Sequence, residues 1–445
     1  MSPGTSPSTS LRLGVSRRSF LTGLGLSGAG VLLAACGGPG STAAPTSAAS
    51  SGSASGAATV TGVVNFYHWR SEDKAIIDTL AASFAEQYPG ASITQTIDPS
   101  EQYQSTAAQK ARDGSIGDAL TAFRGTQLTQ FNEQRIFTDL SSATYADKYV
   151  ANLITPGAID DKQLGFPYQL IFNMPLLNTE IAEKAGVSES PADWDAYLAA
   201  LEKFKAAGVD PIAWPGNDPA NAFQIINTLA MNNGPTPDMF TGIEDGRYKA
   251  TDDWWIKSLT QFQQLSGYFQ ENFAGASTDG VLALYSQGKA AILPTGTYQI
   301  AQVRKAGGAF PIDLAPLITT DAGTTPNYEG VFNATFILGV NTQAKNPDGA
   351  AAWVEFLSQP ENAAVYANGT SQHVTVADVE YENPDLQALA PWIEKNTLLA
   401  PRFQFQNADI RSAIENSLVA VATGSTPQQA AEAAQQIVDE KRPAG

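Results

Sequence analysis

Residues 60–90 read VTGVVNFYHWRSEDKAIIDTLAASFAEQYPG. The first nine residues are rich in β-branched and aromatic side chains, which predicts a strand over residues 60–68. Acidic residues and then apolar residues at helical spacing predict a helix that begins near Ser71. The Pro89-Gly90 pair ends this helix. A buried strand followed directly by an amphipathic helix is the first half of a βαβ unit.

The same alternation continues along the chain. Strand-like runs cover residues 91–97 and 118–122, and helical patterns cover residues 101–112 and 126–134. Strands separated by single helices form parallel βαβ units, whose ligands lie beyond the carboxyl ends of the strands. We therefore expect an α/β fold, with candidate ligand contacts in the segments that follow the first and third strands.

The composition narrows the possible functions. The 445 residues include 26 Lys and Arg against 44 Asp and Glu, so the formal net charge is -18. This charge argues against nucleic acid as a partner and against direct adsorption to anionic lipid. One cysteine and two histidines are too few for a disulfide framework, a zinc cluster or a thiol and imidazole catalytic pair. No cofactor is expected, and recognition must depend mostly on aromatic, amide and carboxylate side chains and on the backbone.

The N-terminal region has the pattern of an export and anchoring segment. Arg17 and Arg18 resemble a twin-arginine export motif, and a modest apolar run then ends in LAAC, which resembles a bacterial lipobox at Cys36. An ordinary secretory signal or a transmembrane anchor is the alternative, but the run is well short of the roughly 20 apolar residues that a spanning helix needs. We expect a signal peptide at residues 1–35, acylation of Cys36, and a flexible tether rich in Gly, Ser and Ala at residues 36–58.

Short motifs at intervals along the chain carry a family resemblance. They are residues 63–69, 84–90 (FAEQYPG), 118 (Asp), 165–168 (GFPY), 172–173 (FN), 185–187 (AGV), 191–194 (PADW) and 288–291 (GKAA). In this order they are similar to extracellular solute-binding proteins of the carbohydrate ABC-importer type, family 1. The resemblance spans residues 60 to about 376, and the helical C-terminal part is compatible with it.

The resemblance implies a two-lobed periplasmic-binding-protein-like fold of the class II type, in which two α/β lobes joined by a hinge close on a ligand. Three strand-like runs are the expected hinge crossings: residues 168–173, 291–294 and 332–340. By family analogy, the first lobe comprises residues 60–168 plus 295–333, and the second lobe comprises residues 169–294 plus 334–445.

Sugars present faces of C–H groups and rims of hydroxyl groups, so aromatic rings and polar side chains in the expected cleft loops are candidate contacts. Packing in the core is the alternative for each aromatic residue, and an ordinary surface charge is the alternative for each arginine. Tyr298 stands where the family usually carries a tryptophan, which disfavours a large stacked oligosaccharide. The candidates are His68, Trp69, Arg70, Ser71, Phe123, Arg124, Tyr168, Gln169, Trp214, Asn217, Asp218, Gly296, Thr297, Tyr298, Glu329, Phe332, Asn333, Arg402 and Asn407.

No motif singles out a catalytic group. The sequence of the body has no nucleophile elbow, zinc-protease helix, dinucleotide loop or Walker loop, and nothing marks a particular carboxylate pair for glycoside hydrolysis. We therefore expect a monomeric, lipid-anchored receptor on the extracytoplasmic face of the membrane, which captures a sugar or oligosaccharide and delivers it to ABC permease subunits. A binding protein for a polyol, polyamine or amino acid is the main alternative, and a secreted carbohydrate-active enzyme is a less favoured one.

Overall fold

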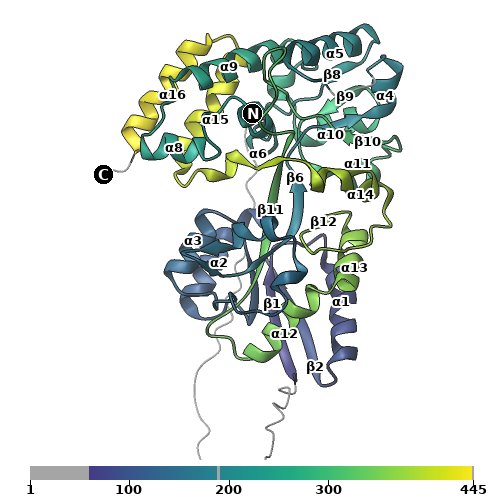
Figure 1. Ribbon diagram of the computed structural model, residues 1–445, viewed down its shortest axis with the longest axis vertical. Coiled ribbons are helices and arrows are strands. Elements are labelled where there is room, and N and C mark those ends of the chain that lie inside the picture. Colours follow the sequence, from purple (N-terminus) through teal and green to yellow (C-terminus); the bar gives the residue numbers. More distant parts are fainter. Residues whose placement is uncertain (1–59, 188–190, 443–445) are drawn as a thin grey trace, which may run out of the picture. The chain divides into compact units, whose positions relative to one another are not determined.

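The structure is a computed structural model that describes residues 60–187 and 191–442. The expected signal peptide, Cys36 and the expected tether lie outside the described residues. Two hydrophobic clusters divide the described chain into a first lobe around β1 and a second lobe around β9 (Figure 1). The long strand β11 runs through both lobes and contributes residues to both clusters.

The first lobe contains the βαβ units that the sequence predicts. Its elements are β1 (Gly62–His68), α1 (Lys74–Gln87), β2 (Ala91–Ile97), α2 (Ser100–Asp113), β3 (Ala119–Ala122), α3 (Thr126–Glu133), η1 (Ala146–Lys148), η2 (Ala151–Leu153), η3 (Thr155–Gly157), β4 (Ala158–Ile159), β5 (Lys162–Gln163), α12 (Pro347–Leu357), α13 (Pro360–Thr370) and β12 (His373–Val374). The strands that link it to the second lobe are β6 (Phe166–Phe172) and β11 (Gly330–Val340).

The second lobe has more helix and a smaller sheet. Its elements are β7 (Leu176–Asn178), α4 (Thr179–Lys184), α5 (Trp194–Ala206), β8 (Asp210–Ile212), α6 (Pro219–Ala222), α7 (Ile225–Met231), α8 (Met239–Asp245), α9 (Asp253–Ser266), η4 (Phe273–Gly275), α10 (Thr278–Ser286), β9 (Ala290–Leu293), η5 (Thr297–Gln299), α11 (Ile300–Lys305), β10 (Ile312–Leu314), η6 (Ala390–Glu394), β13 (Thr397–Leu399), η7 (Pro401–Gln404), α15 (Ala408–Ala422) and α16 (Pro427–Lys441). Helix α14 (Pro384–Leu389) connects it to the first lobe.

The main sheet places the candidate loops at one edge. Its strand order is β12-β6-β11-β3-β1-β2, and β13 pairs with the β11 end that lies in the second lobe. Strands β1, β2 and β3 are parallel, while β11 is antiparallel to β3 and to β6. The carboxyl ends of β1 and β3 therefore lie side by side, which brings Trp69 close to Phe123.

The hinge differs from the expected one after residue 294. Residues 290–293 form β9, which pairs with β7 and β8 inside the second lobe and does not cross between lobes. The crossings are β6, β11 and α14, in which Leu386 packs in the first lobe and Leu389 packs in the second. Residues 295–333 therefore belong to the second lobe, and the chain from Phe336 to Leu386 belongs to the first, the reverse of the expectation.

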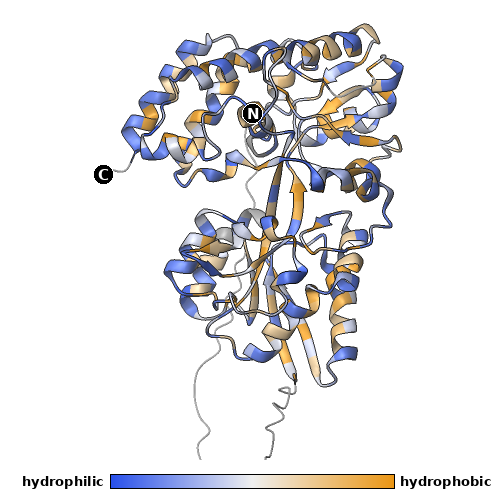
Figure 2. Ribbon diagram, in the orientation of Figure 1, coloured by the Kyte–Doolittle hydropathy of each residue, from blue (hydrophilic) through white to orange (hydrophobic). Residues whose placement is uncertain are grey.

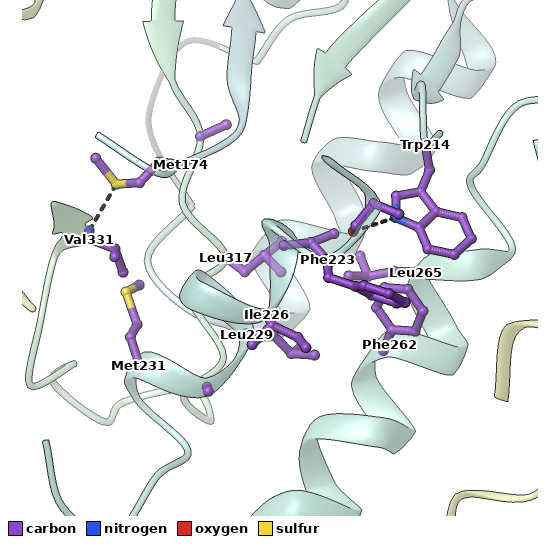
Figure 3. Packing of buried hydrophobic residues seen from close by; sticks show 14 of the residues in the cluster. Met174, Trp214, Phe223, Ile226, Leu229, Met231, Phe262, Leu265, Leu317 and Val331 are labelled. Carbon is purple, nitrogen blue, oxygen red and sulfur yellow. Dashed lines mark hydrogen bonds between the residues drawn. The ribbon is translucent and has the colours of Figure 1, made fainter. Parts of the chain in front are cut away.

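Apolar side chains from strands and helices fill both lobes. Figure 2 shows hydrophobic residues concentrated on the strands and hydrophilic residues on the outer helix faces. In the second lobe, α7 and α9 pack with Trp214 and Met174 into one buried cluster (Figure 3). The Met174 sulfur accepts a hydrogen bond from the backbone N–H of Val331, 3.1 Å away, which fastens the second-lobe end of β11 to this core (Figure 3).

Candidate functional site

The segments that follow β1 and β3 place two predicted aromatic residues against each other. The rings of Trp69 and Phe123 stack, with centroids 3.8 Å apart and an interplanar angle of 20°. Tyr103 and Phe336 approach the Trp69 ring edge-on, with centroids 5.1 and 4.9 Å from it. Trp69 is buried and Phe123 is partly exposed. Phe123 therefore offers the accessible ring, and Trp69 supports it from within the lobe.

Hydrogen bonds inside the first lobe hold His68 and Arg70. The Nδ1 atom of His68 accepts from the backbone N–H of Arg70 at 3.1 Å, and its Nε2 lies 2.9 Å from Oε1 of Gln95. Burial lowers the pKa of His68 to about 4, against the opposite effect of the hydrogen bond to Gln95. The guanidinium of Arg70 pairs with Asp73 at 2.9 Å, and the same carboxylate accepts from the hydroxyl of Tyr366 at 2.5 Å.

The two hinge candidates on β6 face the interior of the first lobe. Gln169 Nε2 donates to the hydroxyl of Tyr366 at 2.5 Å and to Asp73 at 3.3 Å, so it completes the network around that carboxylate. Tyr168 packs on the Tyr366 ring, and its buried hydroxyl has no partner among the described residues. Ser71 is exposed. The charged and polar side chains of this network stabilise the lobe and the start of the hinge.

Arg124 contacts both the hinge and the second lobe. Its Nε donates to Oδ1 of Asn333 on β11 at 2.7 Å, and its Nη2 donates to the carbonyl of Ala400 at 2.6 Å. Its guanidinium carbon lies 5.5 Å from the centroid of the Phe403 ring. Burial lowers the pKa of Arg124 to about 10. Phe332, beside Asn333, is buried in the second-lobe cluster.

A hydrogen-bonded polar group lies on the second lobe, where α6, α10 and η5 meet. Asp218 accepts from the hydroxyl of Thr278 at 2.5 Å and from the side-chain amide of Asn221 at 3.3 Å. Oδ1 of Asn221 accepts from the hydroxyl of Tyr298 at 2.8 Å, and that hydroxyl accepts from Thr295 at 3.0 Å. Asp218, Asn221 and Tyr298 are all partly exposed. The group therefore presents carboxylate, amide and phenol atoms at a surface.

Buried amides extend the polar region toward the hinge. The side-chain amides of Asn173 and Asn227 both donate to Oε1 of Gln224, at 3.1 and 3.2 Å. Asn227 Oδ1 accepts from the backbone N–H of Arg402, whose side chain pairs with the buried Glu415 at 2.6 Å. The Oδ1 atom of Asn173 is buried without a partner among the described residues. The sequence analysis did not name Asn173, Gln224 or Asn227 as candidates. The available signal was that Gln224 and Asn227 are polar residues three positions apart in an otherwise apolar helical run.

The structure places Trp214 in the core, which corrects its proposed role as a stacking surface. Its side chain is 1 % exposed and stacks on Phe269, with centroids 4.9 Å apart. Its indole N–H donates to the carbonyl of Ala222 at 2.9 Å (Figure 3). Packing on both sides leaves no face of this ring for a ligand.

Three other candidates lie in different surroundings. Glu329 accepts from Lys395 at 3.0 Å and from the backbone N–H of Asn396 at 3.1 Å. Asn407 caps α15 by accepting from the backbone N–H groups of residues 409 and 410. Asn217 is exposed next to Asp218. The contacts of Glu329 and Asn407 are therefore explained by local structure. Asn217 alone of the three lies beside the polar group formed by Asp218, Asn221 and Tyr298.

Gly296 and Thr297 set the position of Tyr298. The hydroxyl of Thr297 accepts from the backbone N–H of Phe172 at 3.2 Å. A Cβ atom at residue 296 would lie 2.7 and 2.9 Å from Tyr298 ring carbons and 3.0 Å from the carbonyl oxygen of Phe172. Glycine is therefore required where η5 passes the end of β6.

We expect Gly296→Ala to lower the free energy of unfolding by about 2 kcal/mol, because overpacking typically costs about 1–3 kcal/mol. Urea denaturation measures this change. Gly280→Ala in α10 is the matched control, since a Cβ there meets only the Ser277 hydroxyl at 3.4 Å. Alanine is also the better helix former at that position. Equal stability of the two variants would contradict the role given to Gly296.

The described residues contain no group of three or more His, Cys, Asp or Glu that could hold a metal ion. Within residues 60–187 and 191–442, no helix has both the length and the apolar character needed to cross a membrane.

The sequence model of the family described as bacterial extracellular solute-binding protein matches residues 79–399, well over half of the chain. The chain belongs to this family. The fold described above is thus that of a solute-binding protein, a class of receptors and not of enzymes.

Curated relatives and solved structures resemble this solute-binding protein over different lengths. A "Probable sugar-binding periplasmic protein" of Brucella suis is 28% identical over 135 residues, which cover 30% of this chain and 32% of the relative. The chain thus spans about a third of the length of that relative. The unliganded RafE of Streptococcus pneumoniae has a TM-score of 0.75 at 16% identity, with 86% of this chain and 99% of RafE covered. RafE in complex with raffinose has a TM-score of 0.72 at 17% identity, with coverage of 86% and 100%. At such identity, these structures support the fold alone.

Proposed function

We propose that this solute-binding protein captures a sugar or oligosaccharide between its lobes and delivers it to the membrane subunits of an ABC importer. The observation that carries the proposal is the concentration of amide, hydroxyl and guanidinium groups near the hinge. Arg124 and Phe123 come from the first lobe, whereas Asn221, Tyr298 and Arg402 come from the second. Such groups suit the hydroxyl rims of a sugar, and the partly exposed Phe123 ring suits its C–H face.

The relatives support the same ligand class. The curated protein of Brucella suis carries a sugar-binding name, and RafE has been solved with raffinose. Both histidines of the chain are buried and make hydrogen bonds within the fold. This fits a protein that binds its solute without reacting with it.

Closure of the two lobes is the proposed mechanism of capture. Three crossings, β6, β11 and α14, connect the lobes and can bend together. Phe336, inside β11, has a φ of +56°, in the left-handed region that a phenylalanine rarely adopts, so the backbone of this crossing strand is strained there. A solute that contacts both lobes favours the closed form, because those contacts exist only there.

Export and anchoring complete the proposal. A twin-arginine signal at residues 1–35 would direct export, acylation of Cys36 would hold the protein at the extracytoplasmic face, and residues 36–58 would act as a tether. The support is the sequence pattern alone. A tethered monomer could meet the permease repeatedly without leaving the membrane surface.

We expect thermal unfolding of the full chain to shift upward with at least one mono- or oligosaccharide. At a concentration 100 times the dissociation constant, a ligand of the folded state adds about 2.7 kcal/mol of stability. Calorimetric titration checks the affinity and stoichiometry. Binding of a polyamine or amino acid without any sugar would contradict the sugar assignment and keep the receptor class. Glycoside hydrolysis at enzyme-like rates would contradict the receptor assignment.

A further inference from the structure

The start of α3 has unused hydrogen-bond donors. The backbone N–H groups of residues 124–128 have no acceptor among the described residues, because the first bond of this helix runs from Thr129 to Gly125. The N-cap residue is Gly125, with a φ of +78°, so no side chain caps the helix, and its first turn has no acid. Free N–H groups and the helix dipole make such a terminus positive.

Gln127, in the first turn of α3, has a side-chain donor at the same place without a partner in the part of the chain that the structure describes. Its side chain is 4 % exposed, and its Oε1 accepts from the backbone N–H of Phe123 at 2.9 Å. This bond folds the amide back over the turn that precedes α3. Its Nε2 is buried and has no partner among the described residues. A buried donor without an acceptor is costly, so this amide points to an acceptor that arrives from outside the chain.

Arg124 adds a full positive charge beside the same turn. The other arginines with mainly buried side chains, Arg70, Arg304 and Arg402, are each paired with a carboxylate. No carboxylate of the described residues lies within ion-pair distance of Arg124, whose bonds go to a neutral amide oxygen and a carbonyl oxygen. Its Nη1 makes no hydrogen bond and is absent from the buried unpaired atoms, so it reaches solvent.

The turn lies against the second lobe. A Cβ atom at Gly125 would lie 3.3 Å from the carbonyl oxygen of Phe403 and 3.7 Å from Nε2 of Gln406. In Figure 1, α3 is at the end of its lobe that faces the other lobe. The nearby second-lobe acids are already engaged: Glu244 accepts from the backbone N–H groups of residues 406 and 407, and Glu415 pairs with Arg402.

We infer that Arg124, Gln127 and the free N–H groups at the start of α3 hold an anionic group of the solute, so that the ligand is an acidic sugar bearing a carboxylate. The inference rests on the proposed function and names the ligand class within it. A neutral hydroxyl group could accept from these donors, but only an anion also neutralises the unpaired guanidinium. The net charge of -18 does not oppose this, because exposed charges are largely screened beyond about 8 Å at physiological ionic strength. A sugar phosphate has the same chemistry and is a separate arm of the test.

The test compares matched acidic and neutral sugars by calorimetric titration of the full chain. The pairs are glucuronate with glucose, galacturonate with galactose, and trigalacturonate with raffinose, and glucose 6-phosphate is the phosphate arm. We expect the carboxylate member of at least one pair to bind 10-fold or more tightly than its neutral counterpart. Arg124→Gln should weaken that binding by about 10- to 100-fold, the usual effect of a hydrogen bond to a charged group. Arg112→Gln, at an exposed arginine of α2, is the matched control and should leave it unchanged.

The Gln127→Glu variant distinguishes weaker binding caused by loss of the anion site from weaker binding caused by unfolding. The new side chain can still accept from the Phe123 N–H, and its second oxygen supplies a carboxylate to the free N–H groups. We expect it to retain or raise the thermal stability, since an acid at a helix N-terminus is stabilising. It should also weaken binding of the acidic sugar at least 10-fold. Unchanged binding by this folded variant would overturn the site.

Different results would overturn the anionic site at the start of α3 and the sugar-receptor function. Neutral sugars that bind as well as their acidic partners would overturn the anionic site and leave the proposed function standing. Preference for the phosphate arm over every carboxylate would overturn the carboxylate assignment. Failure of every sugar to bind would overturn the proposed function together with this inference.

Discussion

Replacing Asp118 by alanine should lower the free energy of unfolding by about 4 kcal/mol. The carboxylate is 3 % exposed and accepts three backbone N–H groups. Oδ2 accepts from Asn65 on β1 at 2.9 Å, and Oδ1 accepts from Lys345 and Asn346 before α12 at 2.7 and 3.1 Å. Hydrogen bonds to a charged group are each worth about 1.5–3 kcal/mol, and they do not add fully when one group makes them all. Urea denaturation of the two proteins measures the difference.

The matched control is Asp113→Ala, at the end of α2. Its carboxylate also accepts from a backbone N–H, that of Ser115 at 3.0 Å, but it is exposed to water. We expect a loss of less than about 1 kcal/mol there, because water replaces the lost acceptor. The loss in the free energy of unfolding for Asp118→Asn should lie between the losses for these two variants. The asparagine amide keeps one acceptor oxygen, but its NH2 group faces a backbone N–H, and two donors cannot bond to each other. A loss at Asp118 as small as at Asp113 would show that these three bonds do not hold the lobe together.

Local sequence patterns predicted the first lobe well. The expected strand at residues 91–97 is β2 (Ala91–Ile97), and the helix expected at residues 101–112 is α2 (Ser100–Asp113). Apolar periodicity, Pro89-Gly90 and the glycine after α2 are local signals, and they set these boundaries without help from the rest of the chain. The segments after β1 and β3 could be named for the same reason, because parallel strands bring their carboxyl ends together.

The division of the lobes depended on pairing between distant segments. The apolar run at residues 290–293 resembles a crossing strand, yet β9 pairs with β7 and β8 within one sheet. Strand β11 crosses because its two ends pair with β13 and with β3, which are more than 200 residues apart in the sequence. Strand periodicity is the same in both cases, so the sequence pattern could not distinguish them.

The candidate site was predicted in part for a similar reason. Trp69 and Phe123 stand at predictable strand ends, but nothing local shows that they stack on each other. Trp214 precedes a Pro-Gly pair and resembles a loop residue, whereas contact with Phe269 buries it. Gln224, at the N-cap of α7, and Asn227, within α7, are buried amides, whereas polar residues in a helical pattern usually indicate a solvent face. Only the tertiary fold turns that face toward the hinge.

Acidification from pH 7 to pH 4 should lower the free energy of unfolding by on the order of 6 kcal/mol through the two histidines. Burial is the largest cause in each case and lowers the pKa of His68 and of His373 to about 4, against 6.5 for a free imidazole. The unfolded chain therefore binds protons below about pH 6.5 that the folded chain does not bind until about pH 4. Stability falls with pH inside this window and the histidine effect levels off below it. Each histidine contributes about 3 kcal/mol, at 1.36 kcal/mol per pKa unit.

His68→Gln and His373→Gln separate the two contributions. Each variant should lose about 3 kcal/mol less than the natural protein between pH 7 and pH 4, as measured by urea denaturation at a series of pH values. Carboxylate titration is common to all three proteins and cancels in the comparison. The variants themselves are expected to be less stable at pH 7, because each removes a buried hydrogen bond, to Gln95 or to the carbonyl of Leu386.

His373 is the histidine whose protonation should also disturb the hinge. It lies on β12, which pairs with β6, and its Nε2 is 2.9 Å from the carbonyl oxygen of Leu386 in α14, the third crossing. Its Nδ1 is buried without a partner among the described residues, so a second proton there would have no acceptor. We therefore expect solute affinity to fall toward pH 4 in the natural protein and less steeply in His373→Gln. Equal pH dependence of affinity and stability in both proteins would show that folding does not lower the pKa of His373.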